Sequence, residues 1–157
     1  MSILILGIGN LLLKDEGVGI HVIRRLEQRK LPNSVHLMDG GTGGLNLFHH
    51  LTKYKKVILI DAINAHKKPG EIIRIAYDPL QLQDKQTELY PHQKPLSMHE
   101  TNFTAVLELA KEMKIKAEII IFGIQPQVID YGEDLSPEVK KSIPLIIKQI
   151  MRELKPF

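Results

Sequence analysis

Uninterrupted runs of apolar residues predict β-strands that are covered on both faces, as in parallel sheets. We expect five strands, over residues 3–6, 35–38, 56–61, 71–77 and 118–124. Apolar residues at helical spacing predict four helices, over 17–29, 45–51, 102–113 and 137–154. Ser136 and Pro137 are typical of a helix N-terminus, and the proline-rich stretch 78–98 predicts a long loop.

This alternation of strands and helices predicts an α/β fold. We expect three layers, with a twisted, mostly parallel five-stranded sheet between helices on both faces, in one domain over residues 1–157. Two consecutive strands are joined through the turn at Pro69 and Gly70, which predicts one antiparallel edge strand.

Composition and charge exclude several kinds of functional site. The chain has 157 residues, a formal net charge of +3 and no cysteine. Any metal must therefore be held by histidine, carboxylate or carbonyl groups, and a cysteine nucleophile is excluded. A small basic excess without a dense Lys/Arg block argues against nucleic-acid binding. Gly7, Gly9 and Asn10 interrupt the N-terminal apolar run, so we expect no signal peptide, no membrane span and a cytoplasmic location.

Glycines and polar residues follow several of the predicted strands. Ligands of such sheets bind beyond the carboxyl ends of the strands, so we expect the segments 7–17, 39–44, 61–62 and 97–101 to converge on one rim. A dinucleotide site is one interpretation of Gly7 and Gly9. This interpretation is disfavoured, because Leu12 stands where the third glycine belongs. Two acidic residues also follow where a pyrophosphate would need a helix N-terminus free of negative charge.

Acidic residues and one histidine are the candidates for chemistry at this rim. Asp15 and Glu16 are adjacent, so one can face the crevice while the other caps the helix that follows; alternatively, both only complement its dipole. Asp61 directly follows an apolar strand, so it needs a metal or a hydrogen-bonding partner there. His99 opens a helix within a polar cluster. Glu16, Asp61 and His99 together could hold a divalent transition ion and leave positions open for water or substrate.

An ordered series of motifs extends over most of the chain. It comprises Gly7-Ile8-Gly9-Asn10, Asp15-Glu16-Gly17-Val18-Gly19, Asp39-Gly40-Gly41-Thr42-x-Gly44, Asp61-Ala62, Pro69-Gly70, Ser97-x-His99, Gly123-Ile124-Gln125-Pro126 and Leu135-Ser136-Pro137. This series resembles the nickel-iron hydrogenase maturation endopeptidases. The resemblance implies an enzyme that removes a C-terminal extension from the hydrogenase large-subunit precursor after nickel insertion.

The resemblance also implies roles for particular residues. The metal-contacting residues correspond to Glu16, Asp61 and His99, and the substrate-selecting loop corresponds to Asp39, Gly40, Gly41, Thr42 and Gly43. Nickel would arrive with the precursor, and the isolated site could take up zinc or cadmium instead. The precursor is the expected partner; neither nucleic acid nor a membrane is expected, and the oligomeric state is left open.

Two mechanisms and two other classes of function stay open at this point. Either the nickel positions the scissile bond and activates water, or the carboxylates act as general acid and base and nickel serves only as a recognition tag. A nickel-sensing chaperone that binds the precursor without cutting it is the second class of function. A nucleotide-binding domain remains the third possibility.

Overall fold

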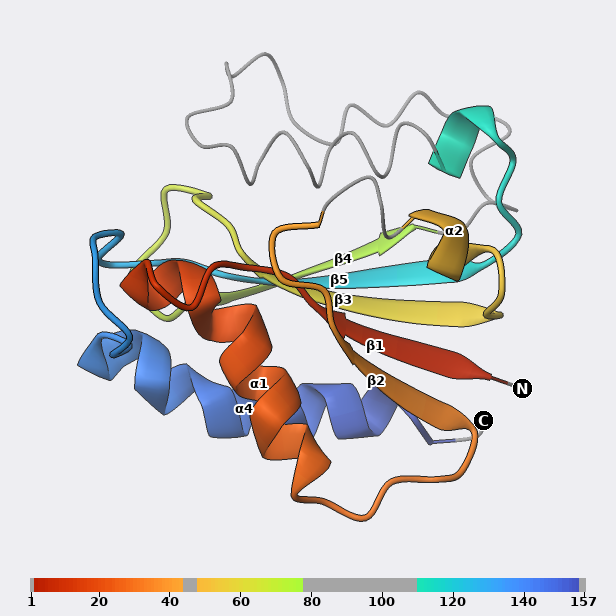
Figure 1. Ribbon diagram of the computed structural model, residues 1–157, viewed down its shortest axis with the longest axis horizontal. Coiled ribbons are helices and arrows are strands. Elements are labelled where there is room, and N and C mark those ends of the chain that lie inside the picture. Colours follow the sequence, from red (N-terminus) through yellow and green to blue (C-terminus); the bar gives the residue numbers. More distant parts are fainter. Residues whose placement is uncertain (1, 44–47, 78–109, 156–157) are drawn as a thin grey trace.

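The computed structural model describes residues 2–43, 48–77 and 110–155, and its elements alternate along the chain as predicted (Figure 1). The strands are β1 (Ile3–Gly7), β2 (Val35–Asp39), β3 (Lys56–Ala62), β4 (Ile72–Tyr77) and β5 (Glu118–Ile124). The helices are the 3-10 turn η1 (Lys14–Gly17), α1 (Val18–Glu27), α2 (Phe48–Leu51) and α4 (Pro137–Glu153). Of the predicted helix 102–113, residues 110–113 are described; 110–112 are helical and Met113 lies in a turn. The predicted loop 78–98 lies outside the described residues.

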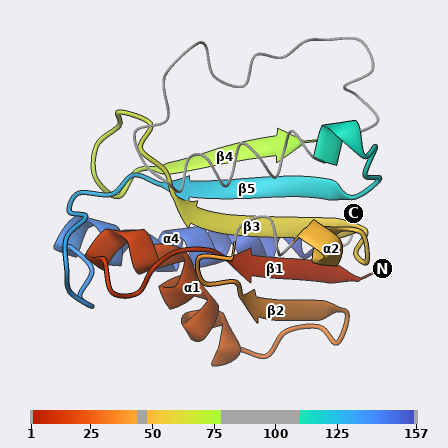
Figure 2. The same cartoon turned by 45° about the horizontal axis from the view of Figure 1, so that its top comes forward.

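The five strands form one sheet in the order β2-β1-β3-β5-β4. Neighbours pair in parallel except β4, which runs antiparallel to β5 at the edge (Figure 2). Every residue of β1 and β3 is buried, as expected for central strands with both faces covered. Gly70 has a φ of +81° in the predicted turn before β4, a conformation that favours glycine. The predicted sheet and its antiparallel edge strand are thus confirmed.

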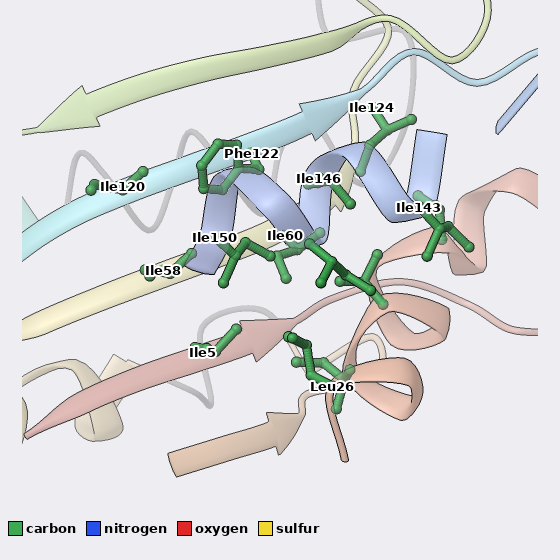
Figure 3. Packing of buried hydrophobic residues seen from close by; sticks show 14 of the residues in the cluster. Ile5, Leu26, Ile58, Ile60, Ile120, Phe122, Ile124, Ile143, Ile146 and Ile150 are labelled. Carbon is green, nitrogen blue, oxygen red and sulfur yellow. The ribbon is translucent and has the colours of Figure 1, made fainter. Parts of the chain in front are cut away.

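One face of the sheet packs against α1 and α4 (Figures 1 and 3). The apolar side chains of β1, β3 and β5 that point to this face meet those of the two helices, as Ile60, Phe122 and Ile150 illustrate. All three side chains are fully buried. Burial of a large apolar side chain contributes about 1.5–3 kcal/mol, so this interface makes a large contribution to the stability of the fold.

The other face packs against α2 and the helical turn at residues 110–112 (Figure 1). Leu51 and Ala110 contribute to this second core, together with strand residues that alternate with those of the first. The helices therefore lie on both faces, and the three-layer arrangement is confirmed. Among the described residues, no helix combines the length and the apolar character needed to cross a membrane.

A partly buried network of charged side chains lies at the end of the sheet at which β3 and β5 begin. Lys56 is 3% exposed, and its Nζ donates to the backbone carbonyl of Glu153 at 3.1 Å and to a carboxylate oxygen of the same residue at 3.2 Å. Arg74 donates to the other carboxylate oxygen at 2.7 Å. Glu118 lies 3.7 Å from the same Nζ. This network fastens the C-terminal part of α4 to three strands of the sheet.

Candidate active site

The loops that follow β1, β2 and β3 meet at the carboxyl ends of these strands, which form one rim of the sheet, as predicted. Backbone hydrogen bonds join them: Gly40 donates to the carbonyl of Gly7 at 2.8 Å, and Gly9 donates to that of Gly41 at 2.8 Å. Ile8 donates to the carbonyl of Ile60 at 2.9 Å. The ends of three parallel strands are therefore fixed relative to one another, which positions the acidic residues that follow them.

Asp61 lies at this edge near the end of β3, with 1% of its surface exposed. Its Oδ1 accepts a hydrogen bond from the backbone N–H of Ala62 at 2.8 Å. Burial raises the pKa of the Asp61 carboxyl well above its ordinary value of 3.8; the Ala62 N–H lowers it in part, and the negative charge of Glu16 raises it further. The protonated form of Asp61 is thus favoured more than in water.

Glu16 reaches the same place from η1, and 5% of its surface is exposed. Its negative charge contributes to the raised pKa of Asp61, although 44 residues separate the two along the chain. The backbone of Glu16 packs tightly against the loop after β1, because a side chain on Gly9 would collide with the carbonyl oxygen of Glu16. Both residues are thus buried near the carboxyl ends of β1 and β3, while their joint action as a site stays a prediction.

Asp15, the neighbour of Glu16, faces away from this pair. It is fully buried, and its two carboxylate oxygens bind the segment between β5 and α4. They accept hydrogen bonds at 2.8–2.9 Å from the backbone N–H groups of Gln127, Val128 and Ser136 and from the hydroxyl of Ser136.

The expectation that one of the two acidic residues caps the following helix is wrong, because α1 begins without a side-chain cap. Ser136 is the N-cap residue of α4 and Pro137 follows it, as predicted, but the Ser136 side chain forms no capping hydrogen bond. Its hydroxyl donates to Asp15 instead.

Gln125 has a structural role that was not predicted from the sequence. It is 6% exposed, and its side-chain oxygen accepts hydrogen bonds from the backbone N–H groups of Ala65 at 2.8 Å and Lys67 at 3.2 Å. Its side-chain nitrogen donates to Asn64 at 3.2 Å. Gln125 therefore holds the loop after β3 against the end of β5. Its place in one of the motifs was the only signal in the sequence.

The two carboxylates fit a divalent metal ion in part. Oxygen donors suit such an ion, and a third donor would complete a site with open positions. That third donor was expected to be His99, which lies outside the described residues, so its convergence with Glu16 and Asp61 stays a prediction. Within residues 2–43, 48–77 and 110–155, no group of three or more histidine and acidic side chains could hold a metal ion.

The predicted substrate loop follows β2 and is hydrogen-bonded to the loop after β1. Asp39 accepts a hydrogen bond from the backbone N–H of Gly41 at 2.9 Å, and Gly43 donates to the carbonyl of Gly40 at 3.0 Å. Gly41 has a φ of +50°, and a side chain built on it would meet no atom of the described residues within 4 Å. Thr42 is exposed. The loop thus has an ordered turn with open space beside its backbone.

Comparison with known proteins gives consistent results. Residues 20–153 match the model of a family described as hydrogenase maturation protease. The chain is 34% identical to the hydrogenase expression/formation protein HupD of Rhodobacter capsulatus, over 98% of this chain and 71% of that one. It is 32% identical to the hydrogenase 2 maturation protease of Escherichia coli, over 99% and 92% of the two chains.

Solved structures agree with these relatives. The hydrogenase maturating endopeptidase HybD of Escherichia coli superposes with a TM-score of 0.81 and 28% identity, over 98% of this chain and 92% of that one. The [NiFe] hydrogenase maturation protease HybD of Thermococcus kodakarensis superposes with a TM-score of 0.74 and 28% identity, over 99% and 100% of the two chains.

Proposed function

Because this chain belongs to the hydrogenase maturation protease family and is thus a peptide-hydrolysing enzyme, we propose that it processes the large-subunit precursor of a [NiFe] hydrogenase. In this proposal it removes the C-terminal extension of the precursor after nickel has been inserted. A cytoplasmic location of this reaction stays a prediction.

The observation that carries the proposal is the buried pair of carboxyl groups at the rim. Burial raises the pKa of Asp61, and the neighbouring charge of Glu16 raises it further. Two carboxyl groups in different environments can divide the work of a general acid and a general base, which peptide hydrolysis requires. The pair therefore supports an aspartic-type peptidase in which Asp61 donates or accepts the proton.

The nickel of the precursor is part of the substrate in this proposal. We expect it to be recognised by Glu16, Asp61 and His99, since two carboxylates and an imidazole suit a divalent transition ion. A bound ion would polarise the scissile carbonyl or activate a water molecule. Ionisation of Asp61 is disfavoured by burial, so the positive charge of a loaded precursor would favour the carboxylate form. This gives a physical reason for an enzyme that distinguishes loaded from empty precursor.

The loop of Asp39, Gly40, Gly41, Thr42 and Gly43 is the proposed binding surface for the precursor tail. Glycines allow the backbone of an extended peptide to approach closely. The open space beside Gly41 leaves room for such an approach, and the loop is hydrogen-bonded to the strand end that leads into the segment carrying Glu16. A peptide bound here would lie next to the acidic pair.

Mass spectrometry of the precursor, with and without nickel, tests the proposal. The unchanged protein should shorten only the nickel-loaded precursor. Glu16→Gln, Asp61→Asn and His99→Ala should each slow processing about 10²–10⁴-fold, as expected when a catalytic acid or base is lost. Asp61→Asn keeps an oxygen that can accept the hydrogen bond from Ala62, so its melting temperature should change little.

His49→Ala provides a matched control, because His49 is an exposed histidine on α2. It should process the precursor at the normal rate. Full activity of all three site variants would rule out the proposed site. A loaded precursor that forms a complex with the protein but keeps its mass would instead support a binding chaperone.

A further inference from the structure

Both oxygens of the Asp15 carboxylate accept hydrogen bonds from other parts of the protein. Its Oδ1 accepts one hydrogen bond and its Oδ2 accepts three, all from the segment that joins β5 to α4. An ionised carboxylate offers about four acceptor positions, so little capacity remains for a metal ion or a substrate. Asp15 is also completely buried. It is therefore not a group that touches the reacting atoms, although it is adjacent to one that we propose does.

Backbone hydrogen bonds join η1 to the segment between β5 and α4 as well. Lys14 donates to the carbonyl of Gly132 at 2.8 Å, and Gly132 donates to that of Leu12 at 2.9 Å. The backbone N–H of Asp15 itself donates to the carbonyl of Val128 at 3.2 Å. The turn that carries Glu16 is thus fixed to a segment more than 100 residues further along the chain.

The opposite side of η1 also packs tightly against another segment. The backbone of Glu16 lies against the loop after β1, where a side chain on Gly9 would collide with it. The backbone of η1 is thus held between these two segments, and its position determines where the side chain of Glu16 begins. Loss of the Asp15 hydrogen bonds would release one of the two sides. The geometry of the acidic pair would then loosen while the rest of the sheet stayed intact.

We propose that Asp15 is a positioning residue that holds Glu16 in place beside Asp61, so that the two carboxyl groups can act on one ligand. This inference rests on the proposed function, because it assumes that Glu16 is a site residue. It assigns separate tasks to the two neighbouring acids: Glu16 contacts the ligand, and Asp15 fixes the turn that carries it.

Asp15→Asn tests the proposal, because it keeps the size of the side chain but places an NH₂ group among N–H and O–H donors. We expect a loss in Zn²⁺ affinity, measured by calorimetry on the purified protein, of about 10–100-fold, the range typical of groups that orient metal ligands. The kcat for loaded precursor should fall by a similar factor, with little change in KM.

Ile150→Ala is the control for a loss of stability alone. Ile150 is fully buried on α4, about one turn before Glu153, which binds Lys56 at the beginning of β3, so it lies at the end of the sheet opposite to the rim. Both variants should melt at a lower temperature than the unchanged protein. Below these melting temperatures, Ile150→Ala should keep its Zn²⁺ affinity and kcat. If Asp15→Asn lost no more of either than Ile150→Ala does, Asp15 would be merely structural and the proposal would be overturned.

A double variant separates this proposal from the proposed function. If Asp15 acts through Glu16, then Asp15→Asn should cost no further Zn²⁺ affinity in a protein that already carries Glu16→Gln. An additional full loss would contradict the proposal. If Glu16→Gln alone changed neither Zn²⁺ affinity nor processing, Glu16 would not be a site residue and this inference would be overturned. The proposed function itself would fail only if the unchanged protein left the mass of the loaded precursor unchanged.

If Asp15→Asn does not fold, Ser136→Ala removes the hydroxyl donor to Asp15 and keeps the backbone donors. It should lower the Zn²⁺ affinity in the same direction by a smaller, few-fold factor. An unchanged affinity in this variant would count against the proposal.

Discussion

The second residue of α1, Gly19, allows the helix to lie directly on the ends of β1 and β3. A Cβ atom on Gly19 would lie 2.5 Å from the carbonyl oxygen of Ile8 and still closer to that of Ile60. Both oxygens belong to the backbone, and the one of Ile60 already accepts a hydrogen bond from Ile8. Neither can move without disturbing the rim, so we predict that Gly19→Ala forces α1 away from the sheet.

The cost of this change follows from the overlap. The Cβ would be about 0.9 Å short of the 3.4 Å at which ordinary contact begins. Overpacking of this kind costs about 1–3 kcal/mol, and occasionally more. Alanine regains up to about 1 kcal/mol of helix propensity, but less near a helix end. We therefore expect a net loss of about 2 kcal/mol, or about 4–8 °C in melting temperature for a chain of this size.

Thermal unfolding and urea denaturation of Gly19→Ala measure this loss. The urea midpoint should fall with little change in slope, since the native and unfolded surfaces remain similar. Processing should also slow at temperatures where the variant is folded, because Ile60 directly precedes Asp61. Gly41→Ala is a useful comparison: its φ is positive but the space around it is open, so the expected cost is only the backbone strain of about 1 kcal/mol. A Gly19→Ala protein as stable as the unchanged one would refute the packing argument.

Two further predictions concern stability away from the site. Burial raises the pKa of Glu153, but hydrogen bonds from Arg74 and Lys56 outweigh this effect and leave the pKa below its ordinary value of 4.5. The Glu153 carboxylate therefore stabilises the fold above about pH 4.5, and this contribution is lost as the pH falls through the lowered pKa. Glu153→Gln should therefore cost about 1–2 kcal/mol at pH 7 and much less in acid, measured by urea denaturation at several pH values, whereas an equal cost at all pH values would contradict the charge argument. Ile150→Ala should cost about 2–5 kcal/mol because Ile150 is fully buried, while Leu145→Ala on the exposed side of α4 should stay within about 0.5 kcal/mol. Equal melting temperatures of these two variants would show that the packing of α4 is wrongly assigned.

The strands could be predicted from the sequence where burial alone determines them. Both β3 and β5 are central strands with apolar residues on both faces, and the expected ranges agree with the structure to within one residue. The signal for β2 was weaker, because β2 is an edge strand in which no residue is buried. Local patterns report which residues are buried, but they do not report which strands are neighbours.

The roles of Asp15 and Glu16 show where sequence reasoning stops. Both are acidic, adjacent and near a helix start, so the sequence could not tell which of them faces the rim. The decisive partners of Asp15 lie 112 or more residues further along the chain. Only the folded chain brings that segment to η1 and uses up one of the two carboxylates.

Asp61 could be proposed as a site residue from the sequence because its surroundings are set locally, by the apolar strand of which it is the last residue but one. Whether Glu16 lies near it depends on the order of the strands. The chain passes from β1 to β2 by way of α1 on one face, and then returns through α2 on the other face to β3, on the far side of β1. The winding reverses at β1, which is where open α/β sheets bind their ligands. The loop after β1, which leads into Glu16, therefore lies between the ends of β2 and β3 and is hydrogen-bonded to both sides. If a further strand stood between β1 and β3, this loop would lie about 4.8 Å further from Asp61, and the two carboxyl groups would not interact directly.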